Sequence, residues 1–119
     1  MLRTKIEIPI FEYDIHIVLC SDFEQFFNKE ELAFQRPPNS NACCLFTCFD
    51  EPVSYMLFNH DQEITHQMIS HESNHAAFEI CERKGIPITY DNQEVICYLQ
   101  DYIFDRVVTR IKHHPSVKS

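Results

Sequence analysis

The sequence predicts an α+β protein in which a small mixed or antiparallel sheet packs against two long helices. In the first half, apolar residues alternate with polar ones or form short blocks bounded by Pro, Asp and Asn, which is typical of strands. In the second half, apolar residues recur at helical spacing. The 119 residues suit one domain. We expect residues 1–60 to form mainly strands with one helix, 61–112 to form two helices, and 113–119 to form a frayed tail.

Two strands, a helix and two further strands are expected in the first half. Ile15, Ile17 and Leu19 share one face of the second strand, because alternate side chains of a strand point the same way. Ser21 or Asp22 can cap the helix, since a short polar side chain accepts a hydrogen bond from the first turn. In chain order, the expected elements are two strands within 3–20 separated near Pro9, a helix from 21 or 22 that ends before 36, and strands at 42–49 and 53–58.

The second half is expected to hold a buried helix followed by a helix with one polar face. The first helix should begin with Asp61 as N-cap and end with Gly85 as the C′ residue, since glycine readily adopts the left-handed conformation found there. The second should run from about Asn92 to Ile111. Its apolar face consists of Ile96, Leu99, Ile103 and Val107, and its polar face of Glu94, Tyr98, Asp101 and Asp105.

The middle of the first of these helices contains His71-Glu72-Ser73-Asn74-His75, which matches H-E-x-x-H. Residues four apart lie one turn apart on the same helix face, so both imidazoles can reach one tetrahedral Zn²⁺ ion. Glu72 lies about 100° round the helix axis and is left free to act on a zinc-bound water. The alternative interpretation is a pair of histidines that are hydrogen-bonded on a helix face.

A third zinc ligand must come from another element, and we expect Glu94 to provide it. Glu79, one turn beyond His75, is too far along the axis from the first histidine, and Cys81 faces away if the helix continues. The chain between His75 and Glu94 is long enough for a helix end, a reversing loop and an antiparallel helix that returns Glu94 to the histidines. The alternative is a capping box, in which Asp91 caps the last helix and Glu94 reaches back to it.

The composition of the chain limits the partners that it can bind. Its net charge is −8 with the histidines neutral, which argues against binding to nucleic-acid phosphates. No apolar run approaches the roughly 18 residues of a membrane span, and the N-terminus has no signal-peptide core. The six cysteines contain no C-x-x-C pair and lie mostly in apolar runs, as free thiols in a reducing compartment do. We therefore expect a cytoplasmic protein that binds neither nucleic acid nor membrane.

The H-E-x-x-H motif followed by a glutamate from the next helix resembles the zinc-binding pattern of the gluzincin metallopeptidases, and the short chain is similar to the minigluzincins. It also resembles small zincin-like proteins encoded by bacteriophages and prophages. The resemblance rests on residues 71–77, 85–86, 91–94 and 98–102, and on 8–10 with Tyr13. It implies a zincin-like fold, with His71, His75 and Glu94 as Zn²⁺ ligands and Glu72 as the catalytic base. Larger gluzincins often carry an aspartate where this chain has Tyr98.

The expected function is hydrolysis of a peptide or protein substrate by a zinc-dependent metallopeptidase. Zn²⁺ would lower the pKa of a bound water, and Glu72 would take its proton and pass it to the leaving amine. The candidates for stabilising the oxyanion are Tyr90, Tyr98, Tyr102 and His66. The resemblance also implies that residues 53–58 form a sheet edge to which the substrate adds as a strand. The alternative function is a non-catalytic zinc-binding interaction or phage-assembly protein.

Overall fold

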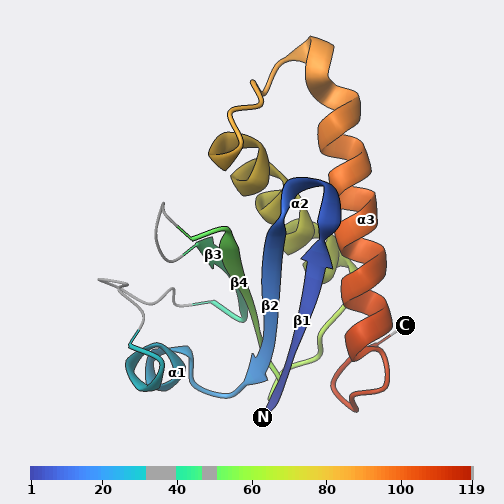
Figure 1. The fold of residues 1–119 in the computed structure, drawn as a ribbon. Helices are drawn as coiled ribbons and strands as arrows, with labels where there is room; N and C mark the ends of the chain where they lie inside the picture. Colours follow the sequence, from blue (N-terminus) through green and yellow to red (C-terminus); the bar gives the residue numbers. More distant parts are fainter. Residues whose placement is uncertain (32–39, 47–50, 119) are drawn as a thin grey trace.

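The computed structural model describes residues 1–31, 40–46 and 51–118, and within them the chain has an α+β architecture. Four strands form one mixed sheet in the order β1-β2-β4-β3, and three α-helices pack around it (Figure 1). In chain order, the elements are β1 (Leu2–Ile8), the 3-10 turn η1 (Pro9–Phe11), β2 (Tyr13–Cys20), α1 (Phe23–Lys29), β3 (Ala42–Phe46), β4 (Val53–Asn59), α2 (His66–Arg83), the 3-10 turn η2 (Tyr90–Asn92) and α3 (Gln93–Ile111).

The two central strands of the sheet are β2 and β4. β2 pairs antiparallel with β1 and parallel with β4, and β3 pairs antiparallel with β4. β4 is therefore hydrogen-bonded on both sides, so the expectation that residues 53–58 form a sheet edge is wrong. β3 lies at the edge instead, and β1 forms the opposite edge. Strand order depends on contacts between distant parts of the chain, which is why the local pattern of 53–58 did not reveal it.

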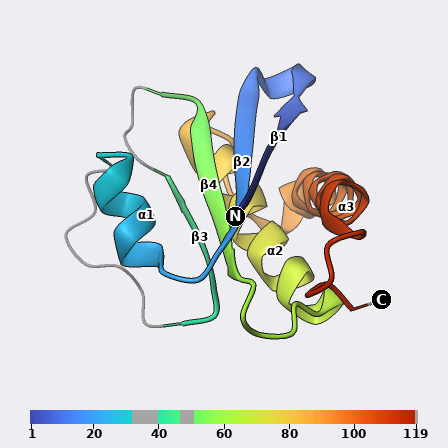
Figure 2. The same cartoon turned by 90° about the horizontal axis from the view of Figure 1, so that it is seen from below.

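Helices cover both faces of the sheet. α2 and α3 lie against one face and α1 against the other (Figure 2). Because successive side chains of a strand point to opposite faces, Ile15 and Ile17 of β2 enter the core beneath α2 and α3, whereas Val18 packs against α1. Burial on both faces explains why β2 carries a nearly continuous apolar run from Ile17 to Cys20.

The first helix, α1, begins where the sequence predicts. The Asp22 side chain accepts a hydrogen bond from the backbone N–H of Gln25 at 3.0 Å, so Asp22 is the N-cap of the two expected candidates, Ser21 and Asp22. The helix ends at Lys29, and Phe23, Phe26 and Phe27 form its buried face. The remaining part of the expected helix from residue 32, and residues 47–49 of the expected strand, lie outside the described residues.

The second helix, α2, begins later than expected and ends where expected. Thr65, not Asp61, is its N-cap, and the Thr65 hydroxyl accepts a hydrogen bond from the Met68 N–H at 3.1 Å. At the other end Gly85 has a φ of 70°, and its N–H donates to the Glu82 carbonyl at 3.3 Å. The N–H of Ile86 donates to the Cys81 carbonyl at 2.8 Å, completing a Schellman motif.

Residues 113–118, where a frayed tail was expected, are hydrogen-bonded to the segment that precedes α2. Ile64 donates its N–H to the Ser116 carbonyl at 2.8 Å, and Lys118 donates its N–H to the Ile64 carbonyl at 2.9 Å. These two hydrogen bonds form an isolated parallel bridge between Ile64 and Val117. Residues 61–65 therefore do not join the helix: 61 and 62 continue the turn after β4, and Ile64 forms the bridge.

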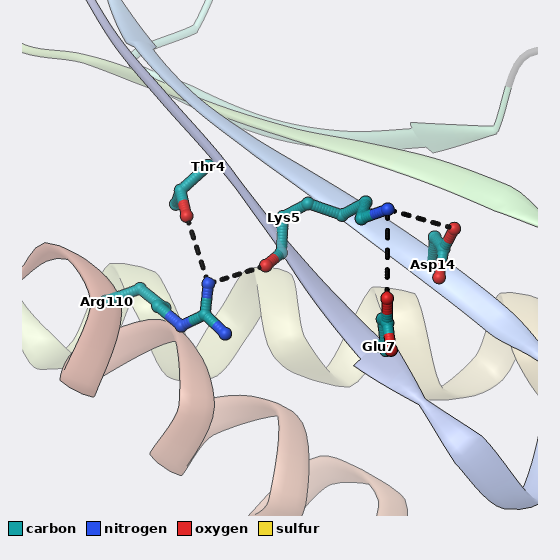
Figure 3. A network of polar contacts seen from close by, with 5 residues as sticks. All are labelled: Thr4, Lys5, Glu7, Asp14 and Arg110. Carbon is teal, nitrogen blue, oxygen red and sulfur yellow. Dashed lines mark hydrogen bonds and ion pairs between the residues drawn. The ribbon is translucent and has the colours of Figure 1, made fainter.

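The third helix, α3, covers the outer edge of β1. Ile103 and Val107 on its apolar face are completely buried, as the helical spacing predicts. On the side toward β1, the Arg110 guanidinium donates to the Lys5 carbonyl at 2.8 Å and to the Thr4 hydroxyl at 3.2 Å (Figure 3). None of the helices within the described residues is long and apolar enough to cross a membrane. The five cysteines that the structure describes are free thiols.

Candidate functional site

The side chains of the H-E-x-x-H motif lie on two neighbouring faces of α2. Glu72 points toward the sheet and is only 6% exposed, whereas His71 and His75 are exposed. The Nε2 atoms of His71 and His75 are 3.2 Å apart and share a hydrogen bond. Their rings meet edge to face, with centroids 4.8 Å apart. The structure therefore contains the histidine pair that the spacing predicts, hydrogen-bonded on a helix face.

The expected Zn²⁺ site is wrong in this structure. Among the residues that the structure describes, no group of three or more His, Cys, Asp and Glu side chains is placed so that it could hold a metal ion. The reason is the rotation of α2. Ser70 is the position that meets α3, since the Gln100 amide donates to its backbone carbonyl at 3.3 Å. His71 and His75 are turned about 100° and 140° away from Ser70 and so do not face α3.

Glu94 lies exposed in the first turn of α3, and it does not form a group with His71 and His75 that could hold a metal ion. Its other expected role, in a capping box with Asp91, is also wrong. The N-cap of α3 is Asn92, whose side chain makes no capping hydrogen bond and instead donates to the Pro87 carbonyl at 2.8 Å. The contacts of the Glu94 carboxylate therefore indicate neither a metal-binding role nor a helix-capping role.

The Glu72 carboxyl lies between α2 and β3. Burial raises its pKa above the ordinary value, and the nearby His75 and His71 rings partly offset that rise. Glu72 also affects a thiol of β3. Burial raises the pKa of the Cys43 thiol to about 12, and the nearby charge of Glu72 contributes to the rise. Burial and the Glu79 and Glu72 charges likewise hold the pKa of Cys44 well above its usual value. Glu72 is thus an acid held beside the middle of an edge strand.

A second carboxyl, Glu79, lies on the same side of α2 and forms a polar network with the sheet. Its Oε2 accepts a hydrogen bond from the Ser54 hydroxyl at 2.8 Å and one from the Cys44 thiol at 3.7 Å. The Ser54 oxygen is in turn 2.5 Å from the Tyr13 hydroxyl. Burial raises the pKa of Glu79, and the two hydrogen bonds counteract it. Burial also raises the pKa of Tyr13 to about 12.

Glu79 is predicted from the sequence to lie too far from His71 to share a zinc ion with it, and the sequence indicates no other role for it. One signal was available, because Glu72 and Glu79 are seven residues apart and therefore lie within about 20° of each other on the helix. Two carboxyls on one stripe of a buried helix require polar partners in the facing layer. The partners, Ser54 and Cys44, come from strands whose alignment depends on the whole sheet.

The candidates for oxyanion stabilisation lie on other surfaces. His66 contacts Phe104 of α3, with ring centroids 5.8 Å apart. Tyr98 and Tyr102 lie on α3 beside the η1 turn, and the Tyr102 hydroxyl donates to the Glu7 carbonyl at 3.4 Å. Tyr90 is 84% exposed in η2.

Comparison of the chain with models of known protein families, with curated proteins and with solved structures finds no match. Function must therefore be inferred from the arrangement of the residues themselves.

Proposed function

We propose that this protein acts on peptides, binding a segment in extended form along the outer edge of β3 and hydrolysing one of its peptide bonds with Glu72 as the general base. The observation that carries the proposal is the enclosed Glu72 carboxyl beside an edge strand. After burial, Glu72 contributes to the raised pKa of two thiols of that strand, Cys43 and Cys44. Peptide substrates commonly add to a sheet edge in this manner.

The hydrogen-bonding pattern of β3 supports edge binding. The Asn59 N–H donates to the Asn41 carbonyl at 2.8 Å, and in an antiparallel pair such hydrogen-bonded positions alternate with positions whose backbone points outward. With the register that joins Ala42 to Phe58, the backbone groups of Ala42 and Cys44 point away from β4. Among the described strands, β4 is the one partner of β3. The Ala42 carbonyl accepts a hydrogen bond from the Ser40 hydroxyl at 2.8 Å, so among the described contacts the Ala42 N–H and the backbone N–H and carbonyl of Cys44 are left for an added strand.

In the proposed reaction, Glu72 removes a proton from a water molecule as the water oxygen attacks the peptide carbonyl carbon. The C–N bond then breaks, and Glu72 returns the proton to the leaving amine. The hydrogen-bonded His71 and His75 rings lie near this carboxyl and partly offset the rise that burial causes in its pKa.

A second candidate function is a non-catalytic module that binds an extended peptide at the same edge. The same outward-pointing backbone of β3 favours it, and it needs no general base. The two functions differ in the fate of the bound peptide. A hydrolase cleaves it, whereas a binding module releases it intact.

A panel of unfolded peptides, followed by mass spectrometry, tests both functions. Under the first, the parent protein produces defined fragments, and Glu72→Gln reduces their rate by at least about 10²-fold while the circular dichroism spectrum is unchanged. Cleavage at the parent rate by Glu72→Gln would show that Glu72 is not the base. Binding with no fragments from either protein would support the non-catalytic module.

The edge itself is tested by Ala42→Pro, which removes an outward N–H and leaves the hydrogen bonds between β3 and β4 in place. We expect this variant to lose peptide binding. Glu7→Pro on β1 is the matched control at the opposite edge and should bind peptide as the parent does. Equal binding by both variants would exclude the β3 edge.

A further inference from the structure

The surface between the η1 turn and α3 contains an apolar groove of about 620 Å³. Ile10 and Phe11 form one wall, and Val95, Tyr98 and Tyr102 form the other. Ile10 is 89% exposed and Tyr98 is 70% exposed, and both belong to the small set of large apolar side chains that the described surface exposes. Exposed apolar side chains grouped around a hollow are typical of an interaction site.

The wall formed by η1 is held in place by its own backbone. Glu12, which ends the turn, has a φ of 49°, and its N–H donates to the Pro9 carbonyl at 3.3 Å. A left-handed conformation at a residue other than glycine costs about 1 kcal/mol or more. The hydrogen-bonded turn fixes the backbone of Pro9–Phe11, which carries the exposed Ile10 side chain.

The opposite rim of the groove is acidic. Glu94, Asp101 and Asp105 are exposed, and they follow one another on α3 at i, i+7 and i+11, which places them along one stripe with Tyr98. Asp101 itself lines the groove. Within the part of the chain that the structure describes, none of the three makes an ion pair. Their charges are therefore available to a ligand.

We propose that this groove binds a basic amphipathic helix of another protein, with the apolar face of the helix in the groove and its Lys and Arg side chains on the acidic stripe. Charge selects this occupant. A second copy of the chain would bring the same acidic stripe against itself, and its net charge of −8 adds to the repulsion. An anionic membrane surface is repelled for the same reason. This surface is separate from the β3 edge, and the inference does not depend on peptide hydrolysis.

The stripe also sets the size of the partner. Asp105 is eleven positions after Glu94, which corresponds to about 16 Å along α3, or three turns of a partner helix. Beyond Asp105 the charge changes sign, because the Arg106 guanidinium lies 5.0 Å from the centre of the Tyr102 ring at that end of the groove. The basic part of the partner should therefore lie toward the N-terminal half of α3.

The binding test uses a synthetic 18-residue helical peptide with Leu on one face and Lys on the other, labelled with a fluorophore. Its anisotropy should rise on addition of the protein, and binding should weaken as salt increases from about 0.05 M to about 0.5 M. A peptide with Glu in place of Lys, and a peptide of the same composition with its order scrambled to remove the apolar face, should not bind. Equal binding of the scrambled peptide would overturn the proposal.

Two sets of variants locate the site. Ile10→Ser with Tyr98→Ser should weaken binding by at least about tenfold, because both apolar walls are altered. The triple variant Glu94→Gln, Asp101→Asn, Asp105→Asn should also weaken it by about tenfold. The matched control neutralises three exposed acids elsewhere, as Glu24→Gln, Glu63→Gln and Glu82→Gln, and makes the same change in net charge. It should alter binding by less than about twofold.

An equal loss in both triple variants would mean that the peptide responds to net charge alone, and the proposal would be wrong. A photo-crosslinker on the peptide gives a readout that does not depend on the variants. Crosslinks to residues of η1 and α3 support the groove, and crosslinks confined to other elements overturn it. Sedimentation that shows the parent chain dimerising through Ile10 and Tyr98 would replace the proposed partner with a second copy.

Discussion

The two outer strands of the sheet are joined to the helices by opposite kinds of polar contact. At β1, an exposed guanidinium of α3 donates to backbone, as Arg110 does to Lys5. At β3, a half-buried carboxylate of α2 accepts from side chains, as Glu79 does from Cys44 and from Ser54 of neighbouring β4. The contact at β1 covers an edge of the sheet with an exposed side chain. The contact at β3 does not cover the edge of that strand. It places the ionisable Glu79 carboxyl in the interior, where the carboxyl must be hydrated, paired or protonated.

The largest effect on either side should come from the apolar layer, which the two sides share. Ile103 of α3 and Ile80 of α2 are both completely buried. Replacing either by Ala removes buried methyl and methylene groups and leaves a cavity, so each variant should lower the free energy of unfolding by about 3 kcal/mol. Denaturation with urea measures both. A loss below about 1 kcal/mol in one of them would show that its helix is loosely packed and that polar contacts hold that side.

The pH dependence of stability should distinguish the two sides. Because burial raises the pKa of Glu79 in the folded protein, the folded state holds the proton more tightly than the unfolded state. Stability is therefore lost as pH rises from the unfolded pKa of Glu through the raised folded pKa, and it is recovered at lower pH. Each pKa unit by which the folded value exceeds the unfolded value corresponds to a loss of about 1.4 kcal/mol in the free energy of unfolding.

Glu79→Gln removes that titration and keeps an oxygen that can accept from Ser54. The free energy of unfolding of the variant should therefore increase relative to that of the parent as pH rises from about 4 to about 8. Urea denaturation at several pH values provides the measurement. A difference between variant and parent that does not change with pH would mean that Glu79 ionises in the folded protein as it does in the unfolded chain.

A smaller effect is expected at the β1 edge. Arg110→Ala removes two partly exposed hydrogen bonds to Thr4 and Lys5, and should cost about 1 kcal/mol with little dependence on pH. Hydrogen exchange should become faster at the amides that join β1 to β2. Lys5→Gln is the control in the same network, because it removes the exposed ion pairs of Lys5 with Glu7 and Asp14, at 3.8 and 3.9 Å (Figure 3). Lys5→Gln should change the free energy of unfolding by less than about 0.5 kcal/mol. A larger loss than in Arg110→Ala would show that the ion pairs of Lys5, and not the hydrogen bonds of Arg110, stabilise this edge.

Local features of the fold were predictable from sequence, and relations between elements were not. Asp22 and Gly85 were found because a cap depends on residues within one turn of it. The start of α2 was missed because Ile64 is held by a bridge to Val117, a residue more than fifty positions away. The edge position assigned to residues 53–58 failed for the same reason, since β4 is enclosed by β2 and β3.

The candidate site divides in the same way. The contact between His71 and His75 follows from spacing along one helix, and the structure contains it. The role of Glu94 depended on how α2 is turned about its axis against α3, which is set by contacts such as that of Ser70 with Gln100. Spacing along the chain carries no information about that rotation. The same limit hid the contacts of Glu79, whose partners lie on two strands.

The bridge between Ile64 and Val117 bears on the order in which the chain can fold during its synthesis. Ile64 precedes α2 and Val117 follows α3, so the bridge closes a loop that contains both helices. A chain leaves the ribosome from its N-terminus, and the four strands and α2 emerge before the residues that hold the first turn of α2. That turn should therefore remain open to proteases on ribosome-bound chains until residues 116–118 have emerged, and become protected only then.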